Sequence, residues 1–70
     1  MKRLTVEREA RGLSRAQLAR KAGMSDITYC KVERGSRPPY PAYREAIARA
    51  LDWPGDPMEL FEEVRDEERE

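Results

Sequence analysis

Two helical patterns meet at Gly23 with no room between them for an ordinary loop. The first pattern runs up to Ala22 and the second begins behind Ser25, so the chain must reverse within Gly23 and Met24. A reversal this short requires a residue with positive φ, which glycine adopts without steric strain. Any fold of this chain must therefore hold two short helices against each other at an angle.

Helix signals recur through the rest of the sequence, and no stretch alternates like a β-strand. Ser14 followed by Gln17 has the form of a capping box and opens the helix that ends at Ala22. Ser25 caps the next helix, and Gly35 ends it. Flanking helices are expected over residues 5–11, from Pro41 to before Trp53, and from Asp56 to Val64. The sequence therefore predicts one all-α domain of five helices over residues 1–70.

The chain has only 70 residues, so it buries little surface, and a deep substrate pocket is not expected. The predicted core consists of apolar side chains at helical spacing. These residues are Leu18, Ala19, Ala22, Tyr29, Val32, Tyr43, Ile47, Ala50, Leu51, Leu60, Phe61 and Val64.

Several functional classes are excluded by what the sequence lacks. Cys30 is the single cysteine and there is no histidine, which rules out a disulfide framework, a zinc finger and most His-dependent catalysis. Tyr40 and Tyr43 have no candidate base or oxyanion site around them, so no catalytic residue, metal or cofactor is predicted. No apolar run reaches the roughly 20 residues that span a bilayer, and no signal peptide is recognisable. A soluble, cytoplasmic protein is expected.

A formal net charge of zero conceals two halves of opposite charge. Residues 1–37 contain ten Lys or Arg against four Asp or Glu, whereas residues 38–70 contain four against ten. The first half is therefore suited to a polyanion such as DNA, although solvated helix faces would give the same counts.

The helix expected after Ser25 has two different faces. Tyr29 and Val32 lie on one side, and the opposite side carries, at helical spacing, Ile27, Cys30, Lys31 and Arg34. Burial of a charged side chain without a partner is unfavourable, so Tyr29 and Val32 are predicted to face the core. The basic side, with Ile27 and Cys30, is then left outward.

An outward face of this kind suits the major groove of DNA. There Ile27 can touch a thymine methyl group, Asp26 can accept a hydrogen bond from cytosine, and Lys31 can donate to guanine. Simpler interpretations stay open: Asp26 stabilises the helix start through the dipole, Ile27 contacts a protein, and Cys30 is a small residue that fits.

Four strings in this region resemble the helix-turn-helix of the Cro and phage-repressor family, also called the xenobiotic-response-element family. They are Gly12-Leu13-Ser14, Gln17-Leu18-Ala19, Ala22-Gly23-Met24-Ser25 and Val32-Glu33-Arg34-Gly35. The resemblance covers roughly residues 4–61. It implies a compact, lambda-repressor-like domain of five helices whose DNA-reading unit spans about residues 14–35. The run of charged residues at about 65–70 gives the chain an acidic end.

The resemblance also implies roles for individual positions. The base-reading positions of the family fall on Ser25, Asp26, Ile27, Cys30 and Lys31. Its phosphate-contacting positions fall on Arg15, Gln17, Arg34, Ser36 and Arg37. Arg8 and Glu33 occupy the places of a structural ion pair that often joins the first helix to the third.

Two functions are compatible with this sequence. The first is a sequence-specific regulator, in particular a repressor that binds double-stranded DNA at a palindromic operator as a homodimer, because one small domain reads few base pairs. Candidate dimer anchors are Trp53, Met58 and Phe61, although core packing is favoured over a dimer contact for Trp53 and Phe61. The alternative is a protein-interaction module, such as an antitoxin or an adaptor of the transcription machinery, in which Ile27 contacts a protein.

Overall fold

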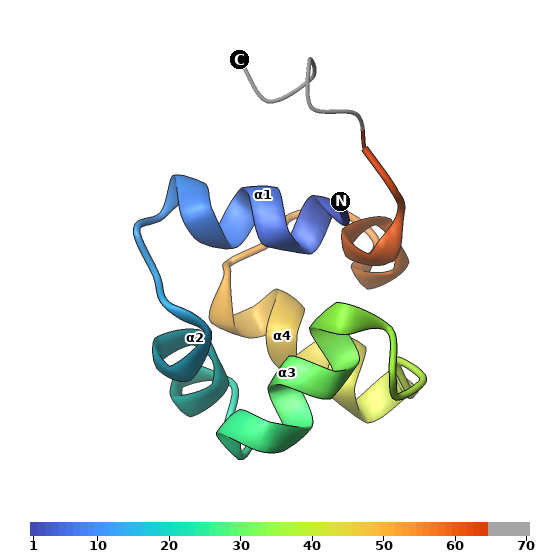
Figure 1. The fold of residues 1–70 in the computed structure, drawn as a ribbon. Coiled ribbons are helices and arrows are strands. Elements are labelled where there is room, and N and C mark those ends of the chain that lie inside the picture. The colour runs from blue at the N-terminus through green and yellow to red at the C-terminus, as the bar shows by residue number, and fades with distance from the viewer. Residues whose placement is uncertain (65–70) are drawn as a thin grey trace.

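The computed structural model describes residues 1–64 and contains four α-helices followed by a short 3₁₀ helix. In chain order they are α1 (Arg3–Ala10), α2 (Arg15–Lys21), α3 (Asp26–Arg34), α4 (Pro41–Ala50) and η1 (Pro57–Phe61). Figure 1 shows α1 across one side of the molecule, with the α2–α3 pair on the other side and η1 beside the N-terminus. In contrast to the helices, the only β-pairing within residues 1–64 is an isolated bridge between Lys2 and Glu63.

Local capping signals set the bounds of α2 and α3, as the sequence predicted. The Ser14 side chain accepts a hydrogen bond from the Gln17 N–H, and the Gln17 side chain accepts one from the Ser14 N–H. The Ser25 side chain accepts from the Thr28 N–H and caps α3. Gly23, between the helices, has φ of +72°, which confirms the predicted positive-φ reversal.

One core cluster holds the helices together. It consists of Leu4, Leu18, Ala19, Tyr29, Val32, Ile47, Ala48, Leu51 and Leu60. The predicted core residues Ala22, Tyr43, Ala50 and Phe61 are only partly buried and pack against this cluster. Leu4 and Ala48 were not predicted: α1 begins two residues earlier than expected, and Ala48 widens the buried face of α4.

The expected fifth helix is much shorter than predicted. Asp56 caps it by accepting from the Met58 N–H, and Pro57 occupies its first turn, but the helix is 3₁₀ and ends at Phe61. The chain is extended at Glu62, and Val64 N–H donates to the Met1 carbonyl at 2.7 Å. Val64 is buried as predicted, although it lies in a backbone pairing with the N-terminus and not in a helix. The predicted acidic end at 65–70 lies outside the described residues.

This same pairing explains the early start of α1. The Arg3 N–H donates to the Glu62 carbonyl at 2.9 Å, and Lys2 adopts an extended conformation as the residue before the helix. The N-terminal residues are thus placed by contacts with residues 62–64. Among residues 1–64, no helix is both long enough and apolar enough to cross a membrane.

Candidate nucleic-acid interface

Helix α3 has one face buried in the core and the opposite face exposed, as the sequence predicted. Tyr29 and Val32 are buried in the core, with exposed fractions of 0% and 1%. Ile27, on the opposite face, is 71% exposed, the most exposed of the large apolar side chains in residues 1–64. Lys31 is also exposed, and Cys30 is half-buried between them. Helix α3 therefore presents a mixed apolar and basic face to solvent.

A shallow, open hollow of about 250 Å³ lies on this outward face of α3. It is lined by Asp26, Ile27, Cys30, Lys31 and Arg34. The lining combines one carboxylate acceptor, two cationic donors and a small apolar centre. These are the groups that recognise cytosine amino groups, guanine acceptors and thymine methyl groups in the major groove. The hollow thus gathers four of the five predicted base-reading residues, together with Arg34.

Ser25, the fifth predicted base-reading residue, is committed to capping. Its hydroxyl accepts from the Thr28 N–H at 3.1 Å and bonds to the Thr28 hydroxyl at 2.9 Å. This arrangement fixes the start of α3 in space. Ser25 directly precedes Asp26 and Ile27 and so lies at the edge of the outward face, but its hydroxyl already forms hydrogen bonds within the fold.

The predicted phosphate-contacting residues lie at two places. Arg15 and Gln17 belong to the first turn of α2, where the Oε1 atom of Gln17 accepts from the Ser14 N–H at 2.8 Å. Arg34, Ser36 and Arg37 lie at and just beyond the end of α3. There the N–H groups of Ser36 and Arg37 donate to the Lys31 carbonyl, which folds this segment back onto the helix. Basic side chains therefore flank the start of α2 and the end of α3.

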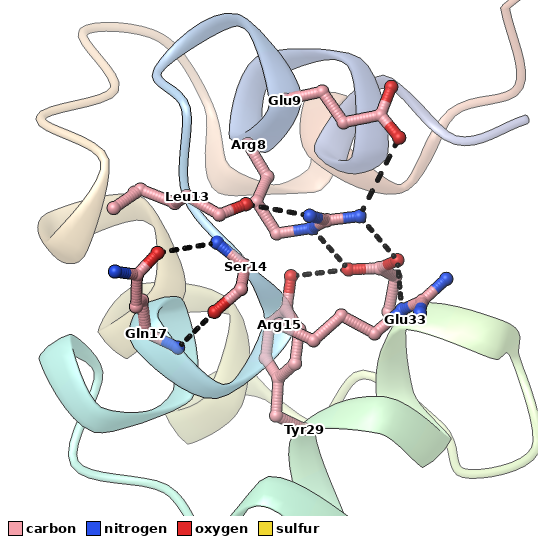
Figure 2. A network of polar contacts seen from close by, with 8 residues as sticks. All are labelled: Arg8, Glu9, Leu13, Ser14, Arg15, Gln17, Tyr29 and Glu33. Carbon is pink, nitrogen blue, oxygen red and sulfur yellow. Dashed lines mark hydrogen bonds and ion pairs between the residues drawn. The ribbon is translucent and has the colours of Figure 1, made fainter.

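Glu33 is the centre of a buried polar network that joins α1, α2 and α3 (Figure 2). Arg8 Nε donates to Glu33 Oε1 at 3.1 Å, and Arg8 Nη2 lies 3.4 Å from Glu33 Oε2. Both side chains of this pair are buried, with exposed fractions of 8% for Arg8 and 3% for Glu33. Arg8 also donates to the Leu13 carbonyl at 2.7 Å, so it ties α1 to the loop before α2.

Two further members of this network were not predicted from the sequence. The Tyr29 hydroxyl donates to Glu33 Oε1 at 2.6 Å, and Arg15 Nε donates to Glu33 Oε2 at 3.1 Å. The spacing of Tyr29 and Glu33 at i and i+4 within one helix was an available signal for the first bond. No comparable sequence signal exists for the second, because Arg15 reaches across from another helix.

The network shifts the protonation equilibria of its members. Burial alone would raise the pKa of Glu33, but hydrogen bonds from Tyr29 and Arg8, with the charge of Arg8 and a hydrogen bond from Arg15, lower it overall. Burial and the hydrogen bond to Glu33 both raise the pKa of Tyr29. The hydrogen bond to Glu33, and then its charge, raise the pKa of Arg15. Glu33 is therefore a carboxylate and Tyr29 a hydrogen-bond donor at neutral pH.

Two other features of the described residues are relevant to candidate sites, a pair of tyrosines and the placement of metal-ligating side chains. The rings of Tyr40 and Tyr43 lie 5.9 Å apart at an angle of 48° and form a tilted pair at the start of α4. Within residues 1–64, no group of three or more Cys, Asp or Glu side chains is arranged to hold a metal ion.

Comparison with known proteins gives one result. A family model described as a helix-turn-helix domain matches residues 2–61, which include all four α-helices and η1. Neither the curated proteins nor the solved structures gave a significant match. The matched family is of the Cro-like, xenobiotic-response-element type.

Proposed function

Because the chain belongs to the helix-turn-helix domain family, which indicates a DNA-binding regulator, we propose that it is a repressor that binds a palindromic operator as a homodimer. The observation that carries this proposal is the outward face of α3. It presents Asp26, Ile27, Cys30 and Lys31 around an open hollow, on a helix whose other face is fixed in the core.

In this proposal α3 lies in the major groove and α2 crosses the DNA backbone. Lys31 donates to a guanine, Asp26 accepts from a cytosine amino group, and Ile27 packs on a thymine methyl group. Cys30 also lines the hollow, and its small side chain allows a base edge to approach. Ser25 contributes by fixing the start of α3.

Phosphate contacts on both sides of the groove would set the register of α3. Arg15 and Gln17 serve one backbone from the start of α2, and the segment of Arg34, Ser36 and Arg37 serves the other. Contacts of this type orient a protein on the duplex without reading its sequence. They also make affinity fall as salt concentration rises.

A dimer is proposed because a single domain of this size reads too few base pairs to select one site in a genome. Of the three predicted anchors, Met58 on η1 is the most accessible, with 48% of its surface exposed. Trp53 and Phe61 are partly buried against the core, and Trp53 Nε1 donates to the Asp56 carbonyl at 3.2 Å. The proposed dimer surface therefore centres on Met58.

The experiment that tests this function is selection of bound fragments from the source genome. The best fragment and a scrambled duplex are then titrated with the protein, and the mass of the protein–DNA complex is measured by sedimentation. The expected result is a short palindrome, bound by two chains and preferred by about 10³-fold or more. Equal binding of the fragment and the scrambled duplex at physiological salt would contradict the proposal.

A second function is favoured by one observation, the 71% exposure of Ile27. An exposed aliphatic side chain on α3 also suits a protein contact, as in an antitoxin or an adaptor of the transcription machinery. In that case Ile27→Ser would abolish capture of the protein partner and leave the affinity for any DNA unchanged. The same substitution weakens binding to a thymine-containing operator if the repressor proposal holds.

A further inference from the structure

The ion pair between Arg15 and Glu33 has one buried and one exposed member. Glu33 is 3% exposed, whereas 53% of the Arg15 side chain is open to solvent. Arg15 donates to Glu33 through Nε alone, and within residues 1–64 its two Nη groups have no hydrogen-bond partner. A guanidinium has five N–H donors in a rigid plane, so Arg15 keeps its outer edge available for a second anion.

The carboxylate that holds Arg15 is itself held on several sides (Figure 2). Tyr29, which is fully buried, donates to Glu33 Oε1 at 2.6 Å. Arg8 donates to the same oxygen at 3.1 Å, and its Nη2 approaches the second oxygen at 3.4 Å. With these partners in place, Glu33 cannot rotate without breaking buried hydrogen bonds, which is unfavourable. Arg15 is therefore anchored to a rigid group.

The charges of the network leave Arg15 free to attract a further anion. Arg8 balances the charge of the buried Glu33, so the charge of Arg15 is left over. Glu9 lies 3.9 Å from Arg8, but its side chain is 43% exposed and solvent screens it. The Arg15 side chain is 53% exposed, so this charge is accessible from solvent.

We infer that Glu33 and Tyr29 are positioning residues that hold the Arg15 guanidinium ready for a phosphate of the DNA backbone. The inference rests on the proposed DNA binding and deepens it. A side chain that is already ordered loses less freedom on binding than a free one. Arg15 then differs from an ordinary surface arginine because it is hydrogen-bonded to Glu33, which is in turn hydrogen-bonded to Tyr29 in the core.

The first test needs no DNA. Nitrogen-15 relaxation and hydrogen exchange of the arginine Nε–H groups are measured in the free protein, with Arg20 as the control because it is an exposed arginine of the same helix. The expected result is a restrained, slowly exchanging Arg15 and a mobile Arg20. In Tyr29→Phe, which keeps the buried ring, Arg15 becomes more mobile. Equal mobility of the two arginines in the wild-type protein would overturn the inference.

The second test measures whether this restraint matters for phosphate. A random duplex is titrated over a range of salt concentrations with the wild-type protein, Arg15→Ala, Tyr29→Phe and the double variant, after melting curves have shown that each is folded. Arg15→Ala is expected to reduce the salt slope by about one. Tyr29→Phe is expected to weaken binding by about two- to tenfold, the effect of ordering one long side chain. The weakening of binding by Tyr29→Phe is expected to disappear in the Arg15→Ala background and to persist in an Arg20→Ala background.

The outcomes separate this inference from the proposed function. If the wild-type protein binds the duplex but Tyr29→Phe weakens binding equally with and without Arg15, or not at all, positioning is overturned and DNA binding stands. If the wild-type protein binds no duplex even at low salt, DNA binding itself is overturned and the phosphate role of Arg15 with it.

Discussion

Glu33 joins three helices through a single carboxylate. It accepts hydrogen bonds from Arg8 of α1, Arg15 of α2 and Tyr29 of its own helix, and its side chain is 3% exposed. An isolated buried charge is very unfavourable, and together these partners keep the carboxylate ionised. The arrangement fixes the relative positions of α1, α2 and α3, on which presentation of the outward face of α3 depends.

Removal of the Glu33 charge should strongly destabilise the protein. Glu33→Gln leaves the buried Arg8 with only the partly exposed Glu9, 3.9 Å away, as a counterion, and breaking a buried pair in this way costs about 3–5 kcal/mol. Glu7→Gln is the matched control, because Glu7 pairs with Arg11 at 2.7 Å on the partly exposed side of α1. An exposed pair contributes about 1 kcal/mol or less. Urea denaturation of both variants tests the difference, and similar losses of stability would contradict the role given to Glu33.

The lowered pKa of Glu33 predicts how stability depends on pH. A carboxylate whose pKa is lower in the folded than in the unfolded state contributes stability that is fully present above the unfolded value, about 4.3. That contribution is lost as the pH falls through the lower, folded value. Titration of the Glu33 carboxyl carbon by NMR should give a midpoint below about 4.3, alongside a falling urea midpoint over the same pH window. A midpoint at or above that value would be inconsistent with the network.

At the scale of elements, α2 and α3 were predictable from the sequence and the ends of the chain were not. The signals at Ser14, Ser25 and Gly35 are local, so a short window of sequence determines where these two helices begin and end. The start of α1 and the shortening of the fifth helix depend on pairing between residues 1–3 and 62–64. Those contacts join residues some sixty positions apart, and helix propensity carries no information about them.

The candidate site shows the same division. The outward placement of Ile27 and Lys31 follows from the charges along one helix, so the sequence predicted it. The bond between Arg15 and Glu33 spans two helices and depends on how they pack. The family resemblance placed Arg15 among the predicted phosphate-contacting residues, but the sequence did not predict its hydrogen bond to the buried Glu33.

The cap of α3 gives a prediction for one element. Ser25→Ala removes the acceptor of the Thr28 N–H and should lower the free energy of unfolding by about 1 kcal/mol. Ser36→Ala serves as the control, since Ser36 is an exposed serine that follows the same helix and caps none of the helices within residues 1–64. Urea denaturation should show a shift for the first variant and almost none for the second. Equal stabilities would mean that the Ser25 cap does not stabilise α3.

At the scale of the whole molecule, the N-terminal residues pair with residues 62–64 of the described chain. The Met1 ammonium lies 3.3 Å from Glu63 Oε1 and 3.2 Å from the Val64 carbonyl, and the Val64 N–H returns a bond to the Met1 carbonyl. Val64 is buried at this junction. Helix α1 is therefore held at its start by residues 62–64 and farther along by the bond between Arg8 and Glu33.

Shortening the chain tests this pairing. A chain that ends at Phe61 loses the buried Val64 side chain and three hydrogen bonds between residues 62–64 and the N-terminal segment, one of them from the Met1 ammonium. A chain that ends at Val64 retains them. At about 1 kcal/mol for each hydrogen bond and about 1.5 kcal/mol or more for the side chain, the difference should be about 4–5 kcal/mol. Thermal and urea denaturation of the two chains measure it directly. Equal stabilities would show that the junction does not stabilise the domain.

The central claim is that the outward face of α3 reads DNA sequence, and one titration tests it most directly. The best selected fragment and a scrambled duplex are titrated with the wild-type protein, Lys31→Ala and Arg37→Ala at one salt concentration. Lys31→Ala is predicted to weaken the specific fragment by about 1–3 kcal/mol more than the scrambled duplex, whereas Arg37→Ala weakens both about equally. If Lys31→Ala lowers affinity for both duplexes to the same extent, the hollow around Cys30 does not read bases and the claim is wrong.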